Sequence, residues 1–304
     1  MRVGLRGGVL CAAMTLAACG AGVDQAGNQA ANTGGDDLLP TGKGAITLQQ
    51  LSSVAEAGKA KPVRGNGITY HGGPVILGTT NVHYIWYGNW SSSDKTILTD
   101  LAQSIGGSPY FNINTTYYNG SNTHVSNSVS FAGSANDSYS HGTSLSDSAI
   151  QSIVAAQNPT DTNGVYFVLT SSDVNETSGF CTQYCGWHTH GTINGRDIKY
   201  AFIGNPARCP SACTNGTKAP NGSVGADGAA SIISHELEEA VTDPDLNAWY
   251  DNRGNENADK CAWTFGSTYT TSNGGVANMR LGSRDFLIQQ NWVNASGGYC
   301  AKSF

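Results

Sequence analysis

Residues 165–169 (VYFVL) constrain the fold more than any other stretch, because they form a continuous apolar run. Such a short run is typical of a strand buried on both faces, at the centre of a sheet. The other elements expected from periodicity and turn residues are strands over 75–87, 112–118, 124–131, 198–203, 277–281 and 286–292, and helices over 91–105 and 144–157. Alternating strands and helices with hairpin insertions predict an α+β or mixed α/β domain around one mixed sheet.

The composition points to an exported, loop-rich protein. Only 12% of the 304 residues are charged, and the chain contains 39 glycines. The formal net charge is −6, and the chain has no basic run. An acidic chain of this kind argues against nucleic acid or an anionic membrane surface as a partner.

The first 19 residues have the features of a bacterial export leader. Arg2 and Arg6 precede a short apolar stretch over 9–16, which is too short to span a bilayer. Residues 16–19 (LAAC) match the lipobox of bacterial lipoproteins, in which Cys19 is acylated; an ordinary signal peptide with an incidental cysteine is the alternative. Gly20, in place of aspartate, favours the outer membrane.

Three regions are therefore expected. The leader over 1–19 precedes a disordered tether over 20–65, which is poor in aromatic residues. One globular domain follows over 66–304. We expect a protein of the bacterial cell envelope, lipid-anchored with a periplasmic or surface face, or a secreted one.

The remaining six cysteines indicate three disulfides in an exported protein. They are Cys181, Cys185, Cys209, Cys213, Cys261 and Cys300. Fifteen pairings are possible. Cys181 with Cys185 and Cys209 with Cys213 would close small local loops, which leaves Cys261 and Cys300 as a long-range pair. A cysteine-based zinc site is the competing interpretation.

His235, Glu236 and Glu239 lie on a helix predicted over 224–242, which stops before Pro244. Residues four apart project from the same face, so His235 and Glu239 point the same way, about 40° apart. Glu236 follows His235 directly, as the general base does in the H-E-x-x-H motif of zinc peptidases. The second histidine of that motif is Glu239 here. The motif predicts zinc held by His235 and Glu239, with Glu236 as the catalytic base.

The faces of this helix support a metal site. Its core stripe consists of Ala230, Ile233, Leu237, Ala240 and Val241. Glu236, Glu239 and Asp243 gather around His235, whereas Glu238 lies on a second polar flank that we expect to face water. A solvated polar face is the alternative. However, the rest of the chain is poor in charge, and crowded acids repel one another unless cations or protons offset them.

A catalytic zinc ion takes three protein ligands and keeps one position open for water. The third ligand is expected from the acidic loop after the helix, with Asp259 or Glu256 favoured and Asp251 as an alternative. His188 or His190 would supply a nitrogen if the cysteine loop folds over the site; otherwise they form a surface pair. A carboxylate-rich site also suits Ca²⁺ or Mn²⁺. We expect a single, monomeric zincin-like domain that hydrolyses a peptide or protein substrate.

Several blocks resemble the EXORDIUM or phosphate-induced protein family. They include 70–75 (YHGGPV), 85–88 (IWYG), 179–181 (GFC), 200–205 (YAFIGN) and 219–222 (APNG). The similarity runs over most of 70–304 in the same order. It implies the family's fold and an exported protein without an established enzymatic activity. A non-catalytic extracellular binding or signalling protein, with a structural metal site or none, is therefore the second functional hypothesis.

Overall fold

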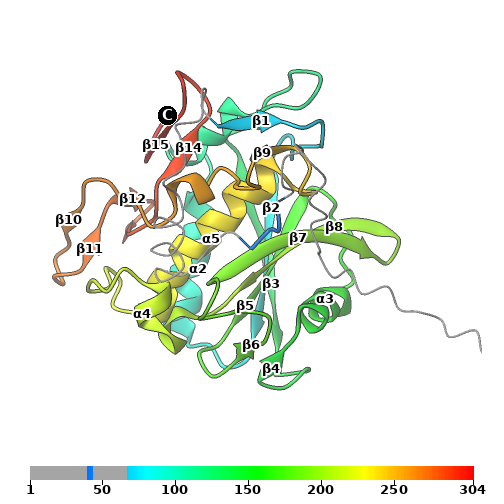
Figure 1. The fold of residues 1–304 in the computed structure, drawn as a ribbon. Coiled ribbons are helices and arrows are strands. Elements are labelled where there is room, and N and C mark those ends of the chain that lie inside the picture. Colours follow the sequence, from blue (N-terminus) through cyan, green and yellow to red (C-terminus); the bar gives the residue numbers. More distant parts are fainter. Residues whose placement is uncertain (1–39, 44–66) are drawn as a thin grey trace, which may run out of the picture. The chain divides into compact units, whose positions relative to one another are not determined.

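The computed structural model describes residues 40–43 and 67–304 (Figure 1). The predicted leader with Cys19, and the predicted tether apart from 40–43, lie outside the described residues. No helix in the described ranges combines the length and apolarity that a membrane crossing requires. The fold and the site are therefore described from 40–43 and 67–304.

A five-stranded mixed sheet forms the centre of the fold. The strand order is β3-β2-β5-β8-β7, with the first four strands parallel and β7 antiparallel to β8 at one edge. These strands are β2 (Thr80–Tyr87), β3 (Val129–Asp137), β5 (Gly164–Thr170), β7 (Gly186–Ile193) and β8 (Arg196–Ile203). Every residue of β5 is buried, so the prediction of a central strand over 165–169 is confirmed.

Three helices cover the two faces of this sheet. They are α2 (Ser92–Ser104), α3 (Asp147–Ala156) and α5 (Val224–Thr242). Figure 1 shows α2 and α5 on one side of the sheet and α3 on the other. Each helix begins after a serine, Ser91, Ser146 or Ser223, whose side chain accepts a backbone N–H of the first turn. The predicted helices are confirmed, and α5 has the expected limits.

The smaller elements form two-stranded ladders and single turns of helix around this core. The strands are β1 (Ile68–Tyr70), β4 (Ser144–Leu145), β6 (Asn175–Glu176), β9 (Trp249–Asp251), β10 (Tyr269–Thr270), β11 (Val276–Ala277), β12 (Met279–Leu281), β13 (Arg284–Phe286), β14 (Asn291–Val293) and β15 (Tyr299–Ala301). The short helices are η1 (Phe111–Thr116), η2 (Pro206–Arg208), α4 (Pro210–Cys213) and η3 (Asp259–Cys261). The architecture is mixed α/β, as predicted, but it contains several sheets instead of one.

The predicted strands over 112–118 and 124–131 do not pair as a hairpin, and only 129–131 belongs to a strand, β3. Phe111–Thr116 forms the 3₁₀ helix η1, and only the single bridge between Tyr118 and His124 remains of the expected ladder. The hydroxyls of Thr115 and Thr116 donate to backbone carbonyls three residues earlier. Such local bonds compete with a strand and favour a turn of helix.

The disulfides cross between loops. Cys181 pairs with Cys209 and Cys185 with Cys213, so the suggested local loops are wrong, whereas Cys261 with Cys300 agrees with the suggestion. Cys209 is the N-cap of the four-residue helix α4, and Cys213 is its last residue. Residues four apart in such a turn present parallel side chains, so both face the neighbouring loop.

Candidate metal centre

Helix α5 is enclosed by the fold, so its polar face is not solvated. The side chains of Glu236, Glu238 and Glu239 are 0% exposed, and that of His235 is 1% exposed. The prediction that Glu238 faces water is wrong, because the amide of Asn291 in β14 donates to its carboxylate. Burial raises the pKa of Glu238 to about 8. The C-terminal hairpin, formed by β14 and β15, thus covers the flank of α5 that carries Glu238 and that helical periodicity alone assigns to solvent.

His235 lies against two carboxylates. Its Nε2 is 2.9 Å from Oε1 of Glu239 and 3.5 Å from Oδ1 of Asp259. The side-chain amide of Gln289 bonds Nδ1 of His235, which leaves Nε2 as the nitrogen that faces the acids. The backbone N–H of Asp259 donates to Oε1 of Glu239 at 3.2 Å, and that of Glu256 donates to Oδ2 of Asp259 at 3.1 Å. The acidic loop is therefore fixed against α5.

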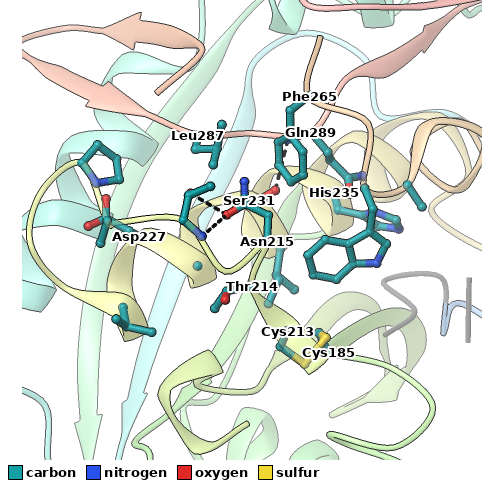
Figure 2. Close-up of a pocket in the computed structure, with 18 residues that line it drawn as sticks. Cys185, Cys213, Thr214, Asn215, Asp227, Ser231, His235, Phe265, Leu287 and Gln289 are labelled. Carbon is teal, nitrogen blue, oxygen red and sulfur yellow. Dashed lines mark hydrogen bonds between the residues drawn. A yellow bond between two sulfur atoms is a disulfide. The ribbon is translucent and has the colours of Figure 1, made fainter. Parts of the chain in front are cut away.

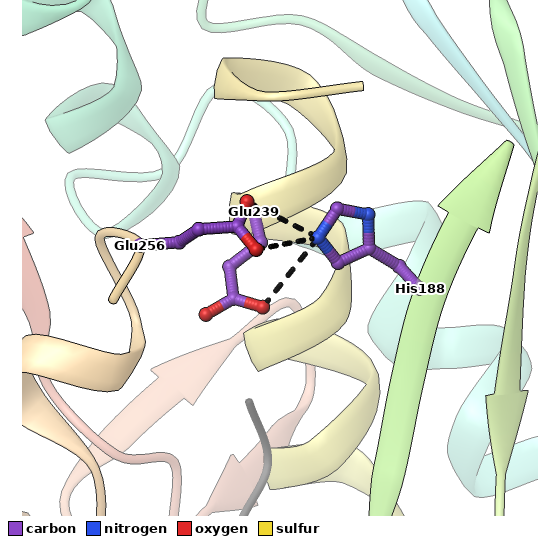
Figure 3. A group of neighbouring side chains, drawn as sticks. All are labelled: His188, Glu239 and Glu256. Carbon is purple, nitrogen blue, oxygen red and sulfur yellow. Dashed lines mark hydrogen bonds and ion pairs between the residues drawn. The ribbon is translucent and has the colours of Figure 1, made fainter. Parts of the chain in front are cut away.

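A second imidazole approaches the other side of Glu239 (Figure 3). Nε2 of His188, in β7, is 3.2 Å and 3.1 Å from the two carboxylate oxygens of Glu256. The same nitrogen is 3.7 Å from Oε2 of Glu239. The structure thus brings His188 and Glu256, two of the residues predicted as possible further ligands, together with Glu239. Glu239 directs one oxygen toward each imidazole.

The spacing of these atoms suits a bound cation. Ligand atoms bonded at about 2.1 Å to one tetrahedral ion lie about 3.4 Å apart. The ligand atoms of His235, Glu239 and Asp259 lie within 4.8 Å of one another, as do those of His188, Glu239 and Glu256. Both groups therefore have the donor types and the separations of a metal site.

Several of the buried polar atoms lack partners. Nε2 of His235, Oε2 of Glu239 and both carboxylate oxygens of Glu236 have no hydrogen-bond partner among the described residues. His235 and Glu239 are close enough for an ion pair, but the bond is not aligned. No lysine or arginine in the described ranges forms an ion pair with Glu236 or Glu239. Leaving such groups unpaired costs about 1–3 kcal/mol each, and more for charged groups.

The pKa values of these side chains reflect their burial and their missing partners. Burial, and then the neighbouring Asp259, raises the pKa of Glu239 to about 7. Burial also raises the pKa of Glu236 and of Glu256 well above the ordinary value. Burial lowers the pKa of His188 to about 3, whereas for His235 the adjacent carboxylates outweigh burial and raise the pKa. Without a cation, the cluster at neutral pH favours protonated acids.

The other predicted ligands lie elsewhere. His190 contacts Asp197 and Asp245, but Lys199 forms ion pairs with both of these acids. Asp251 forms an ion pair with Lys260 at 3.1 Å. These acids already have a lysine as their cation, whereas none of the described lysines or arginines pairs with the acids of the buried cluster. The structure therefore separates His190 and Asp251 from the metal centre.

A largely apolar pocket reaches His235 (Figure 2). Leu287, Phe265 and the Cys185–Cys213 disulfide line it, with Ser231 and Gln289 as polar groups near the imidazole. Its volume is about 50 Å³. A water molecule needs at least about 10–15 Å³ by this measure, so the pocket has room for a few waters or a small side chain.

The outer edge of β7, on the side away from β8, is occupied by residues from the N-terminal part of the chain. The backbone N–H of His188 donates to the carbonyl of Gly42 at 2.8 Å. The Lys43 ammonium donates to Asp147 at 3.0 Å and to Ser178 at 2.8 Å. Residues 40–43 therefore lie along the strand that supplies His188.

Sequence reasoning missed the residues that orient the ligands. Gln289 bonds His235, and Asn257 donates to the backbone carbonyl of Glu238 at 3.1 Å. Both are uncharged side chains outside any motif, and no signal in the single sequence distinguishes them from other amides. Their roles come from tertiary contacts alone.

Comparisons with known proteins agree with the resemblance seen in the sequence. Residues 68–285 match the family model described as the phosphate-induced protein 1 conserved region. Protein EXORDIUM-like 3 of Arabidopsis thaliana is 33% identical over 278 residues, which cover 77% of this chain and 82% of that protein. Protein EXORDIUM-like 5 of the same plant is 34% identical over 272 residues, covering 74% and 75%. Protein PHOSPHATE-INDUCED 1 of Nicotiana tabacum is 28% identical over 214 residues, covering 60% and 67%. No solved structure matches.

Proposed function

The chain belongs to the phosphate-induced protein 1 family, the EXORDIUM-like proteins, and we propose that it is a metal-dependent hydrolase of peptide bonds. His235, Glu239 and Asp259 are the proposed ligands. One observation carries the proposal: Nε2 of His235 is fully buried 2.9 Å from Glu239, yet it forms no aligned hydrogen bond with any described residue. Two groups that face the same point without an aligned hydrogen bond between them are typical of metal ligands. Zn²⁺ fits the donor set best, and Mn²⁺ or Ca²⁺ fit the carboxylates.

The protein's own residues would perform the proton transfer. A divalent ion held there would supply Lewis acidity toward water and a substrate carbonyl. Glu236 follows the ligand His235 on α5, and both of its oxygens lack a described partner. Burial raises its pKa well above the ordinary carboxyl value. A divalent ion beside His235 would favour the ionised form of Glu236, which could then take a proton from water.

Two features of the surroundings support a peptide substrate. The pocket beside His235 would take a small apolar side chain. The edge of β7 already bonds one backbone carbonyl, that of Gly42, through the N–H of His188. An exposed strand edge recognises extended peptides through such main-chain bonds. A peptide would have to displace residues 40–43 to pair with this edge, and it would then lie next to the strand that carries His188.

The test combines metal content with hydrolysis. The full chain is loaded with Zn²⁺, dialysed, and incubated with a library of quenched fluorescent peptides. Glu236→Gln should retain the metal and lose roughly 100-fold or more of the rate, the usual contribution of a general base. Glu238→Gln, which changes a neighbouring buried glutamate outside the ligand set, is the matched control and should retain both. Absence of bound metal, or equal rates for Glu236→Gln and the unmodified chain, would refute the proposal.

A non-catalytic protein with a structural metal ion is the second candidate. The burial of the cluster favours it, since His188, His235 and Glu239 are at most 1% exposed. None of the relatives named above has a hydrolase name. This candidate predicts that a chelator lowers the unfolding midpoint while no peptide is cleaved in either metal or chelator.

Export is a further part of the proposal. Three disulfides persist only in an oxidising compartment, and both cysteine-rich loops of the described domain are fully paired. Acylation at Cys19 would then attach the domain to the outer membrane. Metabolic labelling with a radioactive fatty acid tests this step: Cys19→Ser should abolish the label and release the protein from the membrane fraction. Equal labelling of both proteins would exclude the anchor.

A further inference from the structure

We propose that the cluster binds two divalent ions, with Glu239 as the carboxylate that bridges them. The second site consists of His188, Glu256 and the outer oxygen of Glu239. It extends the proposed function, because it assumes that an ion binds at His235, Glu239 and Asp259. The two ions would lie side by side between α5, β7 and the acidic loop.

The geometry of Glu239 distinguishes its two oxygens. Oε1 faces His235 at 2.9 Å, and Oε2 faces His188 at 3.7 Å. Ions in two-metal sites lie about 3.5–4 Å apart, a distance that one carboxylate spans when each of its oxygens binds one ion. Figure 3 shows Glu239 and Glu256 converging on the same nitrogen of His188. Each ion would therefore have one imidazole, one carboxylate of its own and a share of Glu239.

The charge of the ionised cluster also favours two ions. Glu236, Glu239 and Glu256 are at most 1% exposed, and Asp259 contacts both His235 and the backbone of Glu256. Four carboxylates carry four negative charges, which two divalent ions would balance and one would not. Burying a charge without a partner costs several kcal/mol. The described part of the chain supplies no lysine or arginine to any of these four acids.

A neighbouring group shows how this protein neutralises acids when no metal is needed. His190, Asp197 and Asp245 lie within the same mutual distance as each proposed ligand set. There, Lys199 forms ion pairs with both aspartates, and His190 is 36% exposed. The buried cluster has a similar donor set but lacks the lysine. This contrast makes His190 the natural control for His188, two residues along the same strand.

A hydrogen bond between His188 and Glu256 does not explain the arrangement by itself. Nε2 of His188 lies almost equally far from the two oxygens of Glu256, at 3.2 Å and 3.1 Å. That bond still leaves Oε2 of Glu239 completely buried and without a described partner. An ion between the three residues would satisfy all of these acceptors together.

The test measures the number of ions bound by the full chain. The protein is saturated with Zn²⁺, passed through a desalting column, and analysed by mass spectrometry of the metal against protein concentration. The unmodified chain should hold two ions, while His188→Leu and His235→Leu should each hold one. His190→Leu should still hold two. Retention of all three disulfides and an unchanged near-ultraviolet circular dichroism spectrum confirm the fold of each variant.

The outcomes separate this inference from the proposed function. One ion in the unmodified chain, kept in His188→Leu and lost in His235→Leu, overturns the second site and leaves the first. One ion that both variants lose indicates a single shared ion and also overturns it. No ion at all overturns the proposed function and the second site together. Two ions in His188→Leu refute the assignment of His188 as a ligand.

A measurement on the unmodified chain keeps the inference testable if the variants do not fold. Mn²⁺ replaces Zn²⁺, and electron paramagnetic resonance is recorded at one and two equivalents. Two ions that share a carboxylate are magnetically coupled, so the second equivalent should produce a coupled spectrum in place of the isolated six-line signal. A six-line spectrum at two equivalents, without coupling, would overturn the bridge through Glu239.

Discussion

Replacing Glu239 by glutamine should change stability in opposite directions with and without metal. In chelator at pH 8, Glu239→Gln should be more stable than the unmodified chain. In saturating Zn²⁺ at the same pH, the variant should be less stable. The glutamine keeps the shape and one acceptor oxygen of the side chain, so the N–H of Asp259 that now bonds Oε1 of Glu239 retains its partner.

The magnitude follows from the pKa of Glu239, which burial and then Asp259 raise from 4.5 to about 7. Between these two values the folded chain holds a proton that the unfolded chain has released, so the free energy of unfolding falls as the pH rises. The contribution is complete below about pH 4.5 and is lost above about pH 7. A shift of about 2.5 units at about 1.4 kcal/mol per unit is roughly 3.5 kcal/mol. Glutamine has no proton to lose, so the variant avoids this loss.

Urea denaturation at pH 5 and pH 8, in EDTA and in Zn²⁺, provides the assay. The two proteins should have similar free energies of unfolding at pH 5 in EDTA. At 1,000 times its dissociation constant, a metal ion adds about 4.1 kcal/mol to the free energy of unfolding of the unmodified chain only, which exceeds the roughly 3.5 kcal/mol lost at pH 8. Glu238→Gln is the control. Burial raises the pKa of Glu238 to about 8, but Glu238 is not a proposed ligand. This variant should therefore be more stable than the unmodified chain at pH 8 in both EDTA and Zn²⁺. A variant of Glu239 that is destabilised equally in EDTA and in Zn²⁺ would refute the metal centre.

Three further predictions concern the surroundings of the site. A Cβ at Gly42 would lie 1.9 Å from the carbonyl oxygen of His188 at a φ of +66°, so Gly42→Ala should detach residues 40–43 from β7. The lost hydrogen bond and the strained φ should each cost about 1 kcal/mol. The backbone amide of His188 should therefore exchange its hydrogen about 30-fold faster. An unchanged exchange rate would contradict the pairing of residues 40–43 with β7. Cys261→Ser should lower the free energy of unfolding by about 2–4 kcal/mol and weaken Zn²⁺ binding. Cys181→Ser should lower the free energy of unfolding by a similar amount and leave the Zn²⁺ affinity unchanged in a titration. Hydrogen bonds from Asn255 and the nearby Lys260 hold the pKa of Asp251 below its usual value despite burial. Asp251→Asn should therefore lower the free energy of unfolding at pH 7 and not at pH 2. An equal loss of stability at both pH values would contradict this role of Asp251.

The parts of the fold that were predicted from the sequence are those encoded locally. Residues 165–169 form a buried strand because five successive apolar side chains can be buried only when both faces are covered. The helix over 224–242 has a serine cap at its start and Pro244 just after its end. His235 and Glu239 share a face because four residues make about one helical turn. These statements needed no knowledge of which elements are neighbours.

The parts that were missed depend on what packs around α5. Periodicity assigned Glu238 to solvent, but the strand that carries Asn291 lies on that flank. The same periodicity cannot show that β7 brings His188 within 3.7 Å of Glu239 from a position 51 residues earlier, since 239 − 188 = 51. The local pairing of Cys181 with Cys185 was equally reasonable by spacing and is excluded by the placement of α4. Long-range proximity is the information that a single sequence lacks.

The placement of α5 explains why a chain so poor in charge concentrates acids in its interior. A helix with a solvated face could carry Glu236 and Glu239 at little cost, since water would stabilise both carboxylates. Here the sheet, α2 and the C-terminal hairpin surround α5, so each ionised carboxylate needs a cation or a proton. The protein provides Lys199 for the outer acids and Lys260 for Asp251, but none of its described lysines or arginines pairs with the acids around His235. We propose that metal ions complete a fold that keeps these acids buried, with unsatisfied oxygens beside two imidazoles.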